Sequence, residues 1–196
     1  MSDGGIPFLQ QAIVVSGHMI DHPDRSSPRF PPEAEAAVTK TIAEIFDAWD
    51  VGPGTLLVSG GARGTDIIAA ELARAAGADV WLLVALSEEE FIPGSVRLPG
   101  TDWEERYLAL RAACATRFQA DELGAAPTAE VAFERNNDWL LEVAQSASSR
   151  LRALAVWDRA PGDGPGGTSD FVERARAMGA TVAIVDPADG RLVTAT

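Results

Sequence analysis

Residues 55–66 read TLLVSGGARGTD, a short apolar run followed at once by three glycines, one arginine and one aspartate. The apolar run at 55–60 predicts a buried strand. The alanine-rich stretch from Thr65 to Ala76 predicts a helix that Gly77 ends. Glycines in the turn between them permit a sharp bend and the close approach of another group. Because the first amides of a helix lack intrahelical partners, the turn is a candidate anion site.

Within this turn, the arginine could add a bidentate contact and the hydroxyls further hydrogen bonds to a phosphate. The expected phosphate-binding residues are Ser59, Gly60, Gly61, Arg63, Gly64 and Thr65. The turn lacks the GK[ST] ending of a P-loop. The alternative is a plain strand–helix turn in which Asp66 is only a favourable charge at a helix N-terminus.

Apolar strands and amphipathic helices alternate along the rest of the chain. Strands are expected at 12–16, 55–60, 79–86, 151–158 and 181–186, and helices at 32–50, 65–76, 101–115, 131–147 and 169–178. Residues 87–100 read as a loop, and 116–130 are ambiguous. Strands that are apolar on both faces are typical of a parallel sheet covered by helices. We therefore expect an α/β protein with a single Rossmann-like domain over 1–196, its core at about 12–187, and a mainly parallel sheet of about five or more strands with helices on both faces.

Composition narrows the function classes. The formal net charge is −13, from 16 Lys+Arg against 29 Asp+Glu, so we expect no nucleic-acid partner, because nucleic-acid binders usually carry a basic footprint. No apolar run reaches the ~20 residues needed to span a bilayer, and the N-terminus lacks a basic signal region. We expect a soluble, cytoplasmic protein without a membrane partner. Cys114 is expected in the core, and the chain shows no metal-ligand motif.

Polar residues follow several predicted strands directly, and parallel strands bring such ends to one edge of a sheet. Gly17 and His18 follow the first strand, Asp158 ends the strand at 151–158, and a second glycine-rich loop, GDGPGGTSDF at 162–171, opens a helix. In that loop we expect Gly166, Gly167 and Thr168 to contact a ligand. Two glycine-rich loops at one edge could hold both ends of a nucleotide-like molecule.

Two interpretations remain open for each of three polar sites that follow predicted strands. His18 is either a ligand contact or general base, or a histidine hydrogen-bonded at a strand end. Asp158 either accepts a ribose hydroxyl or caps the next turn. The carboxylate run Glu88–Glu90, with Glu89 at its centre, is either a solvated loop or a source of acid–base chemistry.

The motifs VSGGARGTD at 58–66, PGGTSDF at 165–171 and ERNNDWLL at 134–141 resemble the SLOG superfamily, which is named for DprA and the LOG enzymes. DprA-like proteins carry a similar turn after a strand. LOG-type phosphoribohydrolases carry a glycine-rich turn there and a second one later. The helix with the Arg-Asn pair is similar to the YspA-like branch. The resemblance spans roughly 12–187.

The resemblance implies a Rossmann-like fold that binds nucleotides or nucleotide-derived ligands. LOG enzymes use a glutamate of the second turn with an arginine from the preceding helix, and the matching positions here hold Asp170 and Arg135. With Glu89, these two form the catalytic set expected if the protein is an enzyme. DprA handles single-stranded DNA through a basic surface, which an acidic chain does not offer.

The sequence therefore favours a binding or sensor module for a small phosphorylated nucleotide-type ligand, with no certain cofactor. The alternative is a hydrolase of LOG-like phosphoribohydrolase type, or one acting on another N-glycosidic or phosphate-ester bond. DprA-like handling of nucleic acid is the least favoured alternative. Exposed helices of such folds often pair, so a homodimer also stays open.

Overall fold

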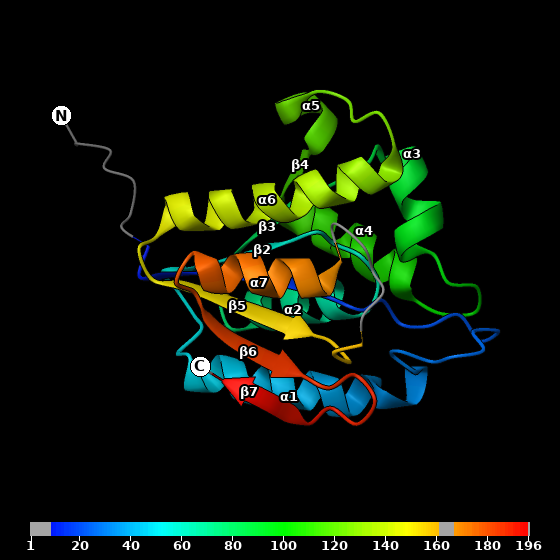
Figure 1. The fold of residues 1–196 in the computed structure, drawn as a ribbon, viewed down its shortest axis with the longest axis horizontal. Coiled ribbons are helices and arrows are strands. Elements are labelled where there is room, and N and C mark those ends of the chain that lie inside the picture. The colour runs from blue at the N-terminus through cyan, green and yellow to red at the C-terminus, as the bar shows by residue number, and fades with distance from the viewer. Residues whose placement is uncertain (1–8, 161–166, 196) are drawn as a thin grey trace.

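The computed structural model describes residues 9–160 and 167–195, and within these ranges seven strands form one sheet (Figure 1). The strands are β1 (Gln11–Gly17), β2 (Thr55–Ser59), β3 (Asp79–Val84), β4 (Ala115–Phe118), β5 (Leu151–Val156), β6 (Thr181–Val185) and β7 (Leu192–Ala195). Their order is β4-β3-β2-β1-β5-β6-β7, and every pairing is parallel except that of β6 with β7. The expected α/β, Rossmann-like class is confirmed.

Helices connect the strands. The α-helices are α1 (Glu35–Ala48), α2 (Thr65–Ala75), α3 (Glu88–Phe91), α4 (Trp103–Ala113), α5 (Gln119–Leu123), α6 (Ala129–Ala147) and α7 (Thr168–Ala177). A 3₁₀ turn, η1 (Pro32–Ala34), leads into α1, where proline suits a first helical turn. A π-helical turn, η2 (Ile92–Val96), follows α3.

The sheet is buried on both faces. Ile13 and Val15 of β1 belong to the same buried cluster as residues of α1, α2 and α4, whereas the alternate residues Ala12 and Val14 belong to a cluster with residues of α6 and α7. Figure 1 shows α6 and α7 crossing one face of the sheet while α1 and α2 lie on the other. Successive side chains of a strand point to opposite faces, so a strand covered on both sides must be apolar throughout.

The strand order reverses beside β1. The chain runs from β1 outward through β2, β3 and β4, and then returns to place β5 on the other side of β1. At such a reversal the connections leave the strand ends in opposite directions and open a crevice at the carboxyl ends of the strands. Gly17 and Val156, the last residues of β1 and β5, are paired there.

α6 begins two residues before the predicted start at residue 131. The Thr128 side chain accepts a hydrogen bond from the Val131 amide at 3.3 Å, which caps the helix. Its buried face includes Trp139 and Leu140, but also the polar residues Asn136 and Asn137. None of the helices in the described ranges combines the length and the apolar character needed to cross a membrane.

The structure differs from the sequence prediction in three segments. Residues 87–100, expected as a loop, contain α3 and η2, which bury Phe91 and Val96. The ambiguous stretch 116–130 holds most of β4, a short edge strand paired with β3, followed by α5. β7 was not expected, and it adds an antiparallel edge next to β6.

Candidate functional site

A cavity of about 440 Å³ lies where the strand order reverses. Its walls come from the end of β1 and the residues after it, the turn between β2 and α2, one face of α6, and the start of α7. Six of the predicted ligand-binding residues line it: Gly17, His18, Gly60, Arg63, Gly167 and Thr168. The 59–66 turn and the described end of the second glycine-rich loop therefore meet at one cavity. Gly166 lies outside the described residues.

The backbone amides of the 59–66 turn are largely used by the protein itself. The Gly61 amide donates to Ser59 Oγ at 3.3 Å, and the Ala62 amide donates to Asp66 Oδ2 at 3.2 Å. The Arg63 amide donates to the Ser95 carbonyl at 2.9 Å. The Ser59 hydroxyl, the Asp66 carboxylate and the Ser95 carbonyl thus accept hydrogen bonds from amides that were expected to bind a phosphate.

Other residues of the turn lie behind the cavity wall. The Thr65 hydroxyl donates to the His18 carbonyl at 2.9 Å, and the Ser59 hydroxyl is directed to the Asp66 carbonyl at 3.4 Å. A side chain on Gly64 (φ +89°) would place its Cβ 2.7 Å from the Ile20 nitrogen. Ser59, Gly61, Gly64 and Thr65 are not among the residues that line the cavity. They pack the turn against the end of β1 and against α4, where Gly61 faces the ring of Tyr107.

The Arg63 side chain, by contrast, reaches the cavity. Its Nε donates to the Ile20 carbonyl at 3.0 Å and its Nη1 to the Gly94 carbonyl at 3.2 Å. Both partners are uncharged, and no carboxylate of the described residues forms an ion pair with Arg63. Burial lowers the pKa of its guanidinium, and the charge of Asp21 opposes that effect. The guanidinium is therefore held in place while its charge is left without a close counter-ion.

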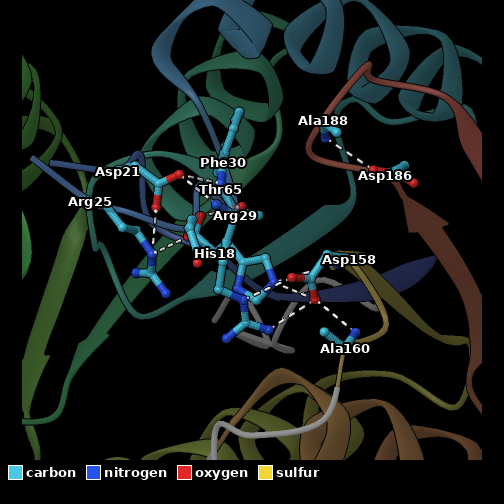
Figure 2. Close-up of polar contacts among 11 residues, drawn as sticks. His18, Asp21, Arg25, Arg29, Phe30, Thr65, Asp158, Ala160, Asp186 and Ala188 are labelled. Carbon is cyan, nitrogen blue, oxygen red and sulfur yellow. Dashed lines mark hydrogen bonds and ion pairs between the residues drawn. The ribbon is translucent and has the colours of Figure 1, made fainter. Parts of the chain in front are cut away.

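A chain of polar contacts crosses the reversal between β1 and β5 (Figure 2). His18 Nε2 lies 3.1 Å from Asp158 Oδ1, and Arg29 Nε donates to Asp158 Oδ2 at 2.8 Å. The hydrogen bonds from Arg29 hold the pKa of the Asp158 carboxyl well below its ordinary range, although desolvation acts in the other direction. Asp158 therefore stays ionised and ties the end of β5 to His18 and to the proline-rich loop that spans residues 22–31.

The proline-rich loop at 22–31 has a second anchor in Asp21. Its Oδ2 accepts hydrogen bonds from the amides of Arg29 at 2.6 Å and Phe30 at 2.7 Å (Figure 2). Arg25 lies 3.4 Å from the other carboxylate oxygen. Arg25 and Arg29 both line the cavity, so this loop forms a wall whose cations are paired with the chain's own carboxylates.

The arrangement of strands and helices is similar to that of a solved protein. The chain matches the crystal structure of DNA processing protein A (DprA) from Streptococcus pneumoniae with a TM-score of 0.51 and 16% identity, covering 89% of this chain. The chain has a DprA-like fold. It spans 50% of the DprA chain's length.

The chain also matches the X-ray structure of the structural-genomics target TM1055 with a TM-score of 0.43 and 18% identity, covering 88% of this chain and 72% of that one. No protein-family model and no curated protein sequence matches the chain. The match to DprA confirms the fold expected from the resemblance. The chemistry of the site has to be argued from its own residues.

In this DprA-like fold, the three expected catalytic residues do not line the cavity. Asp170 Oδ1 accepts a hydrogen bond from Arg174 Nε at 2.9 Å within α7. Glu89 is exposed on α3. Arg135 donates to the Leu123 carbonyl at 2.7 Å, on the side of α6 that faces α5. The structure therefore does not bring these three residues together at the cavity.

Two cavity residues with unusual chemistry, Asp66 and Asn136, lie outside the set of ligand-binding and catalytic residues expected above, although the sequence leaves Asn136 open as either a ligand contact or a brace for its helix. Burial raises the pKa of Asp66 to about 7, and the backbone N–H groups of Ala62, Gly61 and Gly60 offset only part of that rise. The signal for Asn136 was present in the helical spacing. Phe133, Asn136, Asn137 and Leu140 share one face of α6, and all four line the cavity. A polar pair on an otherwise apolar helix face is the pattern that could have identified it.

Proposed function

We propose that this cavity binds a nucleotide or a nucleotide-derived phosphorylated ligand. Its position at the reversal of strand order is where open α/β sheets bind ligands, and its volume of about 440 Å³ suits a small molecule. Phe133 and Met19 line it and are 37% and 39% exposed, so they offer apolar surface on which a base can lie.

The observation that carries the proposal is the state of Arg63. Its guanidinium contacts two neutral carbonyls, and no described carboxylate pairs with it at close range. A phosphate would supply the missing charge and accept charge-assisted hydrogen bonds. This site is also selective against large polyanions, because the chain as a whole carries a net charge of −13.

The start of α7 supports the same proposal. Gly167 occupies the N-cap position without a side-chain cap, and both Gly167 and Thr168 line the cavity. The first amides of a helix carry the positive end of its dipole and commonly bind phosphate. The phosphate position that we infer is therefore the Arg63 side chain together with the start of α7, and not the amides of the 59–66 turn.

Titration calorimetry with AMP, GMP, CMP and UMP tests the proposal. We expect at least one to bind, and Arg63→Gln to weaken that binding about 10- to 100-fold, as loss of a charge-assisted contact does. Arg150→Gln is the matched control, because Arg150 is exposed just before β5, at the opposite edge of the sheet. If the folded protein binds none of the four, or if Arg63→Gln binds as well as the parent, the proposal is wrong.

One observation favours hydrolysis of the bound nucleotide as a second candidate. Asp66 lies in the cavity and has a pKa of about 7, close to working pH, which suits a general acid or base. Incubation of AMP with a high concentration of protein, followed by chromatography for free adenine, tests this reaction. Release that is lost in Asp66→Asn would support it, and unchanged AMP would exclude it for that nucleotide.

A further inference from the structure

Three buried oxygen atoms in the cavity wall have no hydrogen-bond partner among the residues that the structure describes. One of them, Asp21 Oδ1, lies 3.4 Å from the Arg25 guanidinium. The other two are Asp66 Oδ1 and Asn136 Oδ1. The two residues are only 8% and 6% exposed, and both line the cavity. A buried acceptor that has given up water and gained no donor is unfavourable, and native proteins rarely tolerate one without a reason.

The orientation of both side chains is set by their other polar atom. Asn136 Nδ2 donates to the Leu83 carbonyl at 3.1 Å, so a flipped amide would place oxygen against oxygen there. Asp66 Oδ2 accepts from the Ala62 amide at 3.2 Å. In each case the partnered atom anchors the group to the end of a neighbouring strand or turn and leaves Oδ1 for another donor.

The two groups are also close to one another. A Cβ placed on Gly60 would lie 3.0 Å from Asp66 Oδ2 and 3.6 Å from Asn136 Nδ2, so both side chains rest against the same glycine. α2 and α6, on opposite faces of the sheet, thus bring one carboxylate and one carboxamide to a single place in the wall.

We propose that Asp66 and Asn136 form a recognition subsite for a ligand group that carries two neighbouring hydrogen-bond donors. This proposal rests on the proposed function: in a bound nucleotide, the group with two donors is the ribose diol or the N–H edge of the base. A phosphate would face the Asn136 oxygen and, whenever Asp66 is ionised, a carboxylate as well, so the subsite disfavours a phosphate and directs it to Arg63 and the start of α7. The subsite therefore orients the ligand in the cavity.

Nucleosides test the subsite without the phosphate. Adenosine, guanosine, cytidine and uridine are titrated into the parent protein, and the tightest is compared with its 2′-deoxy analogue and with the analogue methylated at the N–H edge of its base. We expect one of these two changes to weaken binding at least tenfold, and its identity tells the diol from the base. Equal binding of all three compounds would overturn the proposal.

Two variants separate recognition from mere structural support. In Asp66→Asn, the amide oxygen can keep the Ala62 hydrogen bond while the NH₂ group replaces Oδ1 as a donor, and Asn136→Leu removes its acceptor altogether. We expect both variants to bind the unmodified nucleoside and its weaker-binding analogue equally well, so that the ratio of the two Kd values falls to about one. Glu142→Gln, exposed on the same α6, should keep the full ratio. If both folded variants keep it too, the proposal is wrong; if one variant does not fold, the other and the analogue series decide.

Failure of the subsite and failure of the proposed function give different results. If nucleotides bind but neither analogue is discriminated, the subsite is wrong and the nucleotide proposal stands. If nucleosides are discriminated but a 5′-phosphate adds no affinity, the subsite stands and the phosphate position at Arg63 is wrong. If neither nucleosides nor nucleotides bind, both proposals fail.

Discussion

The turn at 59–66 and the cavity face of α6 contribute to the same cavity in unequal ways. The turn is rich in glycine and polar groups, yet Gly61, Gly64, Ser59 and Thr65 serve to pack it against its neighbours. α6 has no motif of comparable clarity, yet Phe133, Asn136, Asn137 and Leu140 all line the cavity. Glycine in a turn therefore indicates a close approach, and the group that approaches can be the protein's own backbone.

The largest expected effect is the loss of folding stability that burial of the Asp66 carboxylate in the turn causes as pH rises. Asp66 has a pKa of about 7 in the folded protein against an ordinary value of 3.8, so the folded state holds its proton more tightly. Stability from this group is complete below about pH 4 and is lost as pH rises to about 7. We expect the free energy of unfolding of Asp66→Asn, relative to that of the parent protein, to rise by as much as about 4 kcal/mol between pH 4 and pH 8.

Urea denaturation of both proteins across this pH range measures the difference, and the titrations shared by both chains cancel in it. A difference that does not change with pH would mean that Asp66 is ionised normally and that the turn carries no buried charge cost.

Gly64→Ala tests whether the turn is mainly a packing device. The residue has φ +89° and its Cβ would lie 2.7 Å from the Ile20 nitrogen and 3.0 Å from the His18 carbonyl oxygen. Backbone strain and the clash together should lower the free energy of unfolding by about 3 kcal/mol. Gly100→Ala is the control, with φ +80° and no atom near its Cβ, and should cost only about 1 kcal/mol. Equal costs by denaturation would remove the packing argument.

Gly60→Ala probes the one glycine of the turn that lines the cavity. It does not have a positive φ, so alanine is tolerated by the backbone, but the new methyl would crowd Asp66 and Asn136. We expect affinity for the best-binding nucleotide to fall about tenfold, or about 1.4 kcal/mol, with little loss of stability. Gly52→Ala should bind normally, because its Cβ makes only ordinary contact. Unchanged calorimetric affinity in Gly60→Ala would argue against this part of the wall as a ligand contact.

The smallest effect is expected on the α6 side. Phe133→Ala removes a partly exposed ring from the cavity, and the loss of contact with a base should weaken binding about threefold to tenfold. Leu108→Ala on α4 is the control, since Leu108 is similarly exposed at 43% and does not line the cavity. Equal affinities of the two variants would place the base elsewhere.

The fold was largely predictable because the central strands are apolar on both faces and helices separate them. The structure contains all five parallel strands predicted at 12–16, 55–60, 79–86, 151–158 and 181–186, with ends shifted by at most two residues. β7 and α3 were missed because short elements carry little periodic signal. β7 is defined by pairing with β6, and α3 by the burial of Phe91, and both are tertiary contacts.

The location of the cavity was predictable, but the atoms that face it were not. Strand ends with glycine and polar residues indicated the edge of the sheet at which the cavity lies. Whether an amide in the turn is available depends on distant residues, as with the Arg63 amide, which donates to the Ser95 carbonyl. The unpartnered oxygens of Asp66 and Asn136 likewise depend on two helices on opposite faces of the sheet, each of which brings one side chain to Gly60.

The double anchoring of the proline-rich loop has a kinetic consequence. Asp21 holds its backbone at Arg29 and Phe30, and Asp158 holds the Arg29 side chain. Because these contacts already hold the wall in place, ligand binding should cost little conformational entropy for ordering it. Uptake past this wall should then proceed in one step, with an observed rate that rises linearly with concentration and shows no plateau from a closing motion.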